Sequence, residues 1–464
     1  MLHALLAWTP SVTQHLLFSA IAVLVYVLTT RARREQRAPA TAIAWVMGLA
    51  LVPYLVLPMY LAFGQRKLRP RRAGPVPPPP APAARHWACA LIESFGLAPA
   101  GLCSDMHFHA DGAQAAQALW DTIARARERI DVCTFIIGRD AFGRAVVERL
   151  AERARAGVQV RVLLDGFGAL LVPRGHFDTL RASGGSVTVF RPLFTLRPTG
   201  PRNLRNHRKF VIADSVWLWC GGRNLASQYF LGKPGQAPWL DLSFDLRGPV
   251  ATAAAYQFEL DWCDTRRIPP CPAPVPASAA APRTPPDTLA QLLPSGPDQV
   301  EDTAHALLID ACFRARQRIV VATPYFIPSN PLRDALRLAA RRGVEITVVM
   351  PQRSNHRLAD FVRTRAMRDL AAHGVRFVLL PTMCHAKAVV VDAQMALCGS
   401  INLDLRSLLI NHEASVVFYS AREIEWLARW TLDAAHAGQP YEAHPPGLLR
   451  DVAEGLLLTV AFQL

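Results

Sequence analysis

Two short segments of the chain each carry a histidine and a lysine separated by one residue. His207 and Lys209 form the first pair, and His385 and Lys387 repeat the pattern 178 residues later. Apolar runs typical of β-strands follow both pairs, and residues i and i+2 of an extended chain lie on the same face. Each pair therefore directs an imidazole and an ammonium group toward one spot. Such a combination can bind an anionic group and also attack or protonate it.

The repeat continues beyond the two His-Lys pairs. Asp214 and Asp392 lie five residues after the lysines, in expected strand-to-strand turns, where a structural role is favoured over direct chemistry. Gly-[Gly/Ser]-x-Asn segments then follow at matching offsets and let the backbone pass close to a ligand. Their polar side chains, which we expect to bind a substrate phosphate, are those of Asn224, Ser400 and Asn402.

Two half-sites related by a pseudo-twofold axis would surround a single phosphodiester. The lysines would neutralise its non-bridging oxygens, one histidine would attack phosphorus, and the other would protonate the leaving alkoxide. An incoming hydroxyl would then displace the phosphohistidine. No group of carboxylates with metal-ligand spacing accompanies the motifs in the sequence, so we expect neither a metal nor another cofactor.

An attacking imidazole must be neutral on its reactive nitrogen, and an acid bonded to the other nitrogen fixes that tautomer. Asp241 and Glu413 each lie in a strand-like segment downstream of one motif, and we expect them to orient the histidines. His356, His373 and His412 have no counterpart in the repeat. We interpret these three as ordinary surface or core residues.

Further repeats indicate a duplicated unit. Residues 125–130 return as residues 314–319, and residues 155–165 return as residues 341–351. Each half has the order helix, strand, helix, strand introduced by Gly-Val, another strand, and then the His-Lys pair. We therefore predict an α/β fold in which two half-domains form a pseudo-twofold unit.

The N-terminal residues predict a two-helix membrane hairpin. Apolar runs at about 15–30 and 41–63 suit the ~20 residues that cross ~30 Å of hydrocarbon. A cleaved signal peptide would need a basic segment before the first run, and there is none. The pattern favours a multi-pass membrane protein, and the family resemblance given below implies the bacterial inner (plasma) membrane. The membrane side on which the catalytic part lies is undecided. Four arginines lie between the two runs and five basic residues follow the second, and this difference is too small to indicate an orientation.

Composition and proline-rich stretches define the parts of the chain. The predicted organisation is a membrane segment at 1–72, a linker at 73–85, a first half at 86–265, a linker at 266–286, a second half at 287–435 and a tail at 436–464. The net charge of +15 predicts attraction to a polyanion. The apolar N-terminus favours an anionic phospholipid surface over nucleic acid as that partner.

The paired His-x-Lys-x4-Asp motifs resemble the phospholipase D superfamily. Within it, the chain is similar to the bacterial cardiolipin synthases over nearly its whole length apart from the proline-rich linkers. The resemblance implies conversion of two phosphatidylglycerol molecules to cardiolipin and glycerol through a phosphohistidine. It implies catalytic roles for His207, Lys209, Asp214, His385, Lys387 and Asp392. Which histidine attacks first is not readable from the sequence.

Three other functions stay open. A phospholipase D that uses water as acceptor would share every step except the last nucleophile. A nuclease of the superfamily would also suit the positive charge, although the membrane runs and the lack of an aromatic and basic platform argue against it. A non-catalytic membrane scaffold is disfavoured, because both motifs are intact.

Overall fold

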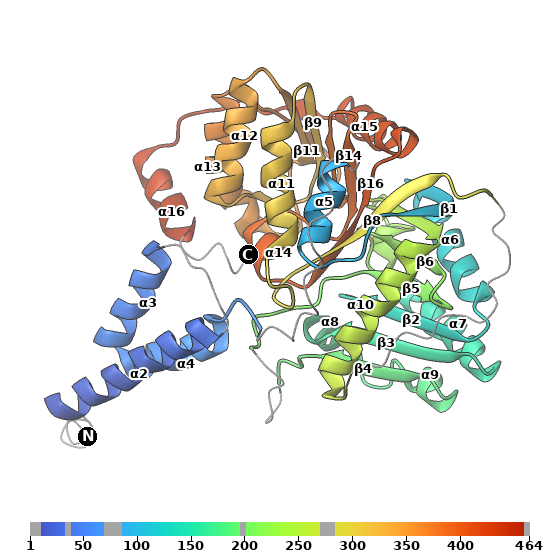
Figure 1. Cartoon of the computed structure of the whole chain (residues 1–464), viewed down its shortest axis with the longest axis horizontal. Helices are drawn as coiled ribbons and strands as arrows, with labels where there is room; N and C mark the ends of the chain where they lie inside the picture. The colour runs from blue at the N-terminus through green and yellow to red at the C-terminus, as the bar shows by residue number, and fades with distance from the viewer. Residues whose placement is uncertain (1–10, 33–38, 69–85, 195–200, 270–283, 459–464) are drawn as a thin grey trace.

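The computed structural model describes residues 11–32, 39–68, 86–194, 201–269 and 284–458. The linker expected at 73–85 and most of the linker expected at 266–286 lie outside the described residues. Apolar helices at the N-terminal end project from a body in which one sheet is covered by helices (Figure 1).

The membrane segment consists of α2 (Val12–Ala32), α3 (Pro39–Leu51) and α4 (Pro53–Phe63). Among the described residues, α2 alone is long and apolar enough to cross a bilayer. The prediction of a continuous helix at 41–63 is wrong. The chain leaves the helical conformation at Val52 (φ −136°, ψ 57°), directly before a proline that has no backbone N–H to continue the helix.

The three apolar helices pack together around Tyr60, which is fully buried. Its hydroxyl lies 2.6 Å from Thr29 Oγ1 of α2. Ser19 Oγ, also in α2, donates to the carbonyl of Ala50 at 3.0 Å. These side chains satisfy their polar groups inside the helical cluster, as an apolar surrounding requires.

A single 15-stranded sheet runs through both halves. From the centre outward, the first-half strands are β1 (Gly101–His109), β7 (Ser243–Arg247), β6 (Trp217–Gly221), β5 (Phe210–Ala213), β2 (Arg129–Thr134), β3 (Gln159–Asp165) and β4 (Ser186–Phe190). The second-half strands, in the same outward order, are β8 (Thr288–Ser295), β16 (Glu413–Phe418), β14 (Met395–Gly399), β13 (Ala388–Val391), β9 (Arg318–Ala322), β11 (Glu345–Pro351) and β12 (Arg376–Leu380). The two series correspond strand by strand, which confirms the pseudo-twofold α/β unit.

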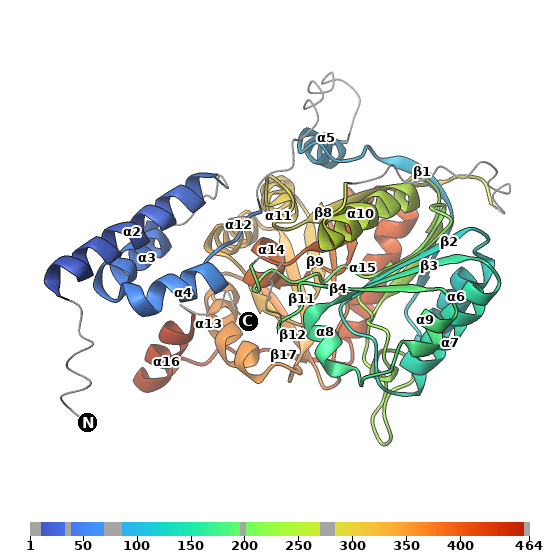
Figure 2. The same cartoon turned by 90° about the horizontal axis from the view of Figure 1, so that it is seen from below.

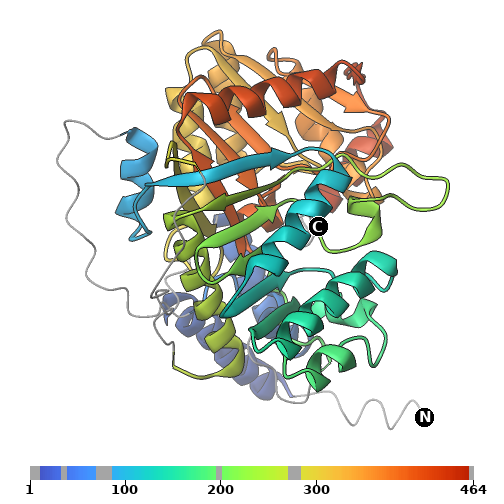
Figure 3. The same ribbon diagram turned by 90° about the vertical axis from the view of Figure 1, so that its right-hand side faces the viewer.

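The two halves meet where β1 and β8 pair in antiparallel fashion, with Gly101 opposite Ala290 and Cys103 opposite Thr288. Figure 3 shows β1, in blue, running between the red strands of the second half and the green strands of the first. A single buried apolar cluster includes side chains from both halves. The joint is therefore continuous in hydrogen bonding and in packing.

Helices cover both faces of each half-sheet. In the first half, α6 (Gly112–Arg125) and α7 (Ala141–Arg155) cover one face, and α10 (Pro249–Arg266) covers the other (Figure 2). The matching helices of the second half are α11 (Thr303–Arg314), α12 (Asn330–Arg341) and α15 (Ala421–Ala435). Strands covered on both faces are continuously apolar, as in the fully buried run of β13.

Two segments differ from the predicted organisation. Helix α5 (Trp87–Ser94) falls in the range assigned to the first half, yet it packs on α11, and Trp87 Nε1 donates to Gln394 at 2.7 Å. The predicted tail contributes β17 (Gln439–Pro440), which pairs with β12. It also contributes α16 (Leu448–Leu458), whose buried Glu454 pairs with Arg368 of α13 (Arg357–Ala371). Both segments therefore belong with the second half in space.

Candidate active site

The two His-Lys motifs immediately precede the equivalent strands β5 and β13, as the sequence predicts. Each motif is hydrogen bonded to the other half of the molecule. The N–H of His207 donates to the carbonyl of His412 at 2.8 Å, and the N–H of His385 donates to the carbonyl of Leu240 at 2.7 Å. These reciprocal bonds hold both motifs at the joint between the halves.

The orienting acids cross from one half to the other. Glu413 Oε2, at the start of β16, lies 3.0 Å from Nδ1 of His207. Asp241 Oδ2 lies 2.7 Å from Nδ1 of His385, and Asp241 precedes β7 by two residues instead of lying in a strand. Each histidine of one half thus depends on a carboxylate of the other, and neither half forms a complete site.

Burial sets the protonation state of the two imidazoles. It lowers the pKa of His207 to about 4, against the opposing effect of Glu413. Burial and the charge of Lys387 lower the pKa of His385 to about 3. Both imidazoles are therefore neutral at pH 7, with Nδ1 facing the acid and Nε2 turned away from it.

The two acids are ionised at neutral pH. Burial alone would raise the pKa of both carboxyl groups. For Asp241, the combined effects of His385, Lys387 and Arg223 outweigh burial and hold the pKa at about 2. His207, Lys209 and Ser400 together do the same for Glu413. An ionised carboxylate beside each Nδ1 fixes the tautomer that leaves Nε2 unprotonated.

Both lysines are almost completely buried beside the histidines. Lys209 Nζ donates to the carbonyl of His207 at 2.8 Å, and Lys387 Nζ lies 2.9 Å from Nδ1 and 3.2 Å from Nε2 of His385. Burial lowers the pKa of Lys209 to about 7 and that of Lys387 to about 8. The positive charges of both lysines lower the pKa of each histidine, so the four side chains are electrostatically coupled in one site.

Aromatic rings enclose the imidazoles. Phe135 packs edge-on to His207, with ring centroids 5.0 Å apart. Tyr229 and Trp239 contact His385, with centroids at 5.0 and 5.6 Å. The side chains of His207 and His385 remain 13% and 5% exposed, so small openings reach otherwise water-poor imidazoles.

The residues expected to bind phosphate have different surroundings. Ser400 donates its hydroxyl to Glu413, so in this structure it supports an orienting acid. Asn224 is buried, and its Nδ2 donates to the hydroxyl of Tyr229 at 2.9 Å. Among the residues that the structure describes, the amide oxygens of Asn224 and Asn402 have no hydrogen-bond partner.

Asp214 and Asp392 lie at the far ends of β5 and β13 from the histidines, in the predicted turns. The carboxylate of Asp214 accepts three backbone N–H groups, from residues 127–129, at 2.8 Å each. The carboxylate of Asp392 accepts those of residues 316–318 at 2.9 Å each. Both aspartates thus anchor the beginning of a neighbouring strand.

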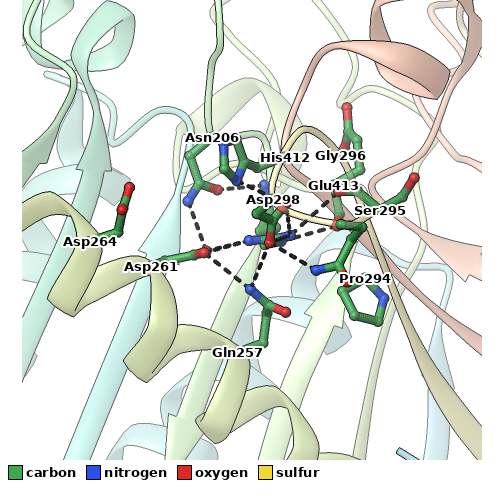
Figure 4. Close-up of polar contacts among 12 residues, drawn as sticks. Asn206, Gln257, Asp261, Asp264, Pro294, Ser295, Gly296, Asp298, His412 and Glu413 are labelled. Carbon is green, nitrogen blue, oxygen red and sulfur yellow. Dashed lines mark hydrogen bonds and ion pairs between the residues drawn. The ribbon is translucent and has the colours of Figure 1, made fainter. Parts of the chain in front are cut away.

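A buried cluster behind His207 escaped the sequence analysis (Figure 4). Arg208 lies between His207 and Lys209 in the chain, is fully buried, and pairs with Asp261 and Asp298. His412, interpreted above as an ordinary residue, places Nδ1 3.2 Å from Asp298 Oδ1. The sequence feature that could have indicated this cluster is a difference between the two motifs: the middle residue is Arg208 in the first and Ala386 in the second.

Asp261, Asp298 and His412 have donor atoms close enough to hold a metal ion. Arg208, however, already pairs with both carboxylates through its guanidinium group. The negative charge of the cluster is thereby balanced by a side chain of the protein itself. We therefore interpret the cluster as a structural ion-pair network.

The duplicated α/β fold and the paired His-Lys motifs define an enzyme of the phospholipase D class. Residues 119–234 and 308–432 match the family described as cardiolipin synthase, phospholipase D-like domain. Residues 18–65 match the phospholipase D-nuclease N-terminal family.

Similar proteins agree with this classification. Cardiolipin synthase A of Pseudomonas putida strain W619 is 32% identical over 426 residues, covering 86% of each chain. Cardiolipin synthase A of Pseudomonas fluorescens strain SBW25 is 30% identical over 451 residues, covering 91% of this chain and 93% of the relative. Phosphatidylserine synthase of Haemophilus influenzae Rd KW20 has the same fold, with a TM-score of 0.59 at 12% identity over 78% of this chain and 98% of the other. The chain belongs to the cardiolipin synthase family of the phospholipase D superfamily, and it is a membrane-associated phosphatidyltransferase.

Proposed function

We propose that the protein transfers a phosphatidyl group from one phosphatidylglycerol molecule to another, giving cardiolipin and glycerol. The observation that carries the proposal is the pair of crossed His–carboxylate contacts with two buried lysines beside them. This arrangement supplies a nucleophile, a proton donor and positive charge around one phosphate. It supports a symmetric two-step transfer through a phosphohistidine.

In the first step, Nε2 of one histidine attacks phosphorus, and the bond from phosphorus to the glycerol oxygen breaks. The glycerol alkoxide takes a proton from the other histidine. Both imidazoles are neutral in the free site, because burial lowers the pKa of each. An entering phosphodiester anion raises these pKa values, so one imidazole acquires the needed proton as the substrate binds.

In the second step, a hydroxyl of the acceptor phosphatidylglycerol loses its proton to the histidine that acted as the acid. The acceptor oxygen then attacks phosphorus, and the bond between phosphorus and the first histidine breaks. The histidine that acts as the acid in the first step thus acts as the base in the second, while the other histidine forms and then releases the bond to phosphorus. Lys209 and Lys387 balance the charge of the phosphoryl oxygens in both steps.

We assign supporting roles to the remaining predicted site residues. The carboxylates of Asp241 and Glu413 orient the imidazoles, and Ser400 supports Glu413. Asn224 and Asn402 contact the phosphate through their Nδ2 groups, because only the amide nitrogen can donate to a phosphate oxygen, and Nδ2 of Asn224 must then leave the hydroxyl of Tyr229. Asp214 and Asp392 stabilise the fold and do not contact the substrate, because their carboxylates accept hydrogen bonds from backbone N–H groups.

We infer a multi-pass location in a bacterial plasma membrane, with the bilayer as the source of the anionic lipid substrate. Helices α3 and α4 together act as a broken second span beside α2. The contact of Thr29 with Tyr60 supports this arrangement, because it ties the end of α2 to α4.

The test is product analysis with radiolabelled phosphatidylglycerol and the purified full-length chain. We expect labelled cardiolipin and free glycerol. Phosphatidic acid as the main product would instead establish hydrolysis by water, and cleavage of DNA would favour a nuclease.

Replacement of either histidine tests the mechanism. His207→Ala and His385→Ala are each expected to lower the rate of cardiolipin formation by about 10³-fold or more while the protein stays folded. His373→Ala, at the end of α13, serves as the matched control and is expected to keep wild-type activity. Substantial activity in either site variant would rule out a mechanism that needs both histidines.

A further inference from the structure

We propose that the segment leaving the membrane helices positions the first catalytic motif, and that Lys67 is the positioning residue through which it acts. This exit segment comprises residues 64–68, directly after α4. The inference rests on the catalytic roles proposed above for His207 and Glu413. It extends them by making the chemistry depend on where the membrane helices hold the body.

The exit segment is bound to the loop at residues 296–302, which joins β8 to α11. The buried Lys67 ammonium group donates to the carbonyls of Gly296, Gln299 and Glu301 at 3.2, 3.0 and 3.2 Å. It also pairs with Asp302 at 2.8 Å. The N–H of Leu68 donates to the carbonyl of Pro297 at 3.0 Å. Lys67 thus contacts the loop at four residues along its course, and Arg66 adds an ion pair to Asp302 at 2.7 Å.

The same loop carries Asp298 into the cluster behind His207. Asp298 pairs with Arg208 at 2.9 Å, and Arg208 Nε donates to the carbonyl of Glu413 at 3.0 Å. Figure 4 shows Asp298 among Asn206, Asp261, His412 and Glu413. A shift of the loop would therefore move the residue that orients His207 and the backbone on both sides of that histidine.

A second contact links the exit of α4 to the approach to the motif. Asn203 Nδ2 donates to the carbonyl of Phe63 at 3.2 Å. Arg406 fixes Asn203 in turn, with bonds of 3.0 Å to its side chain and 2.7 Å to its carbonyl. Asn203 stands four residues before His207. The end of the membrane helices is therefore connected to the first motif in two ways, through Lys67 and the loop at 296–302 and through Asn203.

Among the residues that the structure describes, this connection reaches the first motif and has no counterpart at the second. Ala386 occupies the position in the second motif that Arg208 occupies in the first. The N–H of His385 donates to the carbonyl of Leu240, whereas the N–H of His207 donates to the carbonyl of His412. The His207–Glu413 pair is accordingly the one coupled to the membrane helices. A displacement of about 1 Å at a reacting group can lower a rate by about 100-fold, so loosening this connection should act on turnover.

The experiment compares Lys67→Met, Lys67→Gln and Lys67→Arg in the full-length chain, assayed in vesicles of equal parts phosphatidylglycerol and phosphatidylcholine. Arg31→Met removes a positive charge from the exposed end of α2 and is the matched control. We expect Lys67→Met to lower kcat about tenfold or more, with KM within about twofold of wild type. Lys67→Gln should be intermediate, Lys67→Arg should recover most of the rate, and Arg31→Met should match wild type.

A structural role alone predicts a different result. In that case the rate lost would equal the fraction of protein that is unfolded, measured by thermal unfolding of the same vesicle samples. Unchanged kcat in Lys67→Met, or a loss that Lys67→Arg fails to recover, would overturn the inference. If Lys67→Met does not fold, Lys67→Gln gives the same comparison. Failure of the wild-type chain to make cardiolipin would instead overturn the proposed function.

Discussion

Burial shifts the pKa of every titratable side chain at the centre of the site. It lowers the pKa of the imidazoles and of both ammonium groups, and it competes with the ion pairs that keep Asp241 and Glu413 ionised. The free site therefore avoids carrying four permanent positive charges in a water-poor space. In the proposed mechanism, an entering phosphate anion raises these pKa values again and so restores positive charge beside the phosphate.

These pKa values predict a bell-shaped dependence of kcat/KM on pH, which reports the free enzyme. The rate should fall as pH rises past about 7 to 8, because Lys209 and Lys387 lose the charge that binds the phosphate. It should also fall as pH drops toward about 4, because a protonated His207 cannot attack. The measurement is kcat/KM of the full-length chain in detergent across this range.

Lys209→Arg gives the discriminating control, because a guanidinium group keeps its charge. The variant should lose part of its maximal rate and move the alkaline limb to higher pH. An alkaline limb that stays in place would show that Lys209 is not the titrating group.

The residues of the site could be predicted from sequence more readily than their pairing. The repeat identifies both His-Lys pairs, and the need for a neutral imidazole identifies Asp241 and Glu413. Which acid serves which histidine depends on how the strands of the two halves meet, and local sequence does not contain that information. Arg208 was overlooked because it alternates with the motif residues and faces the opposite side of the strand.

Among the elements of the fold, the turns after β5 and β13 show how one residue can fix two strands. Asp214 and Asp392 adopt left-handed backbone conformations, with φ of 54° and 51°. Aspartate tolerates this region better than most residues. Their carboxylates bind the backbone at the beginning of β2 and β9, so each turn locks an adjacent pair of strands.

Asp392→Ala should therefore destabilise the fold by about 1–3 kcal/mol, because it leaves N–H groups of residues 316–318 without their acceptor. Asp392→Asn keeps an acceptor and tolerates the backbone, so its loss should be smaller. Thermal unfolding gives the stability, and kcat per folded molecule gives the chemistry. A loss of kcat comparable to that of His385→Ala in fully folded protein would instead assign Asp392 a catalytic role.

The N-terminal helices illustrate a limit of hydropathy patterns. Residues 41–63 are apolar throughout, so composition alone predicts one helix. The chain breaks at Val52 because Pro53 begins a new helix with its fixed φ and absent N–H. Packing of α4 against α2 through Tyr60 then stabilises the two shorter helices.

At the scale of the whole molecule, the halves recognised from the repeat are neither independent in structure nor complete in function. They share the β1–β8 joint, one apolar core cluster and two crossed His–carboxylate contacts. The repeat predicted the two halves because duplication preserves spacing. It could not assign α5 or the C-terminal residues, since neither segment has a counterpart among the described residues of the other half.

This architecture predicts that the covalent connection between the halves is dispensable once the protein has folded. A protease site inserted within residues 270–283 would allow the folded chain to be cut between α10 and β8. The two fragments should stay together through gel filtration and keep most of the cardiolipin-forming activity, because the joint consists of strand pairing and buried apolar contacts. A fragment of residues 284–464 expressed alone should be inactive, since His385 would lack Asp241. Separation of the fragments under native conditions, or activity of the second half alone, would contradict the shared site.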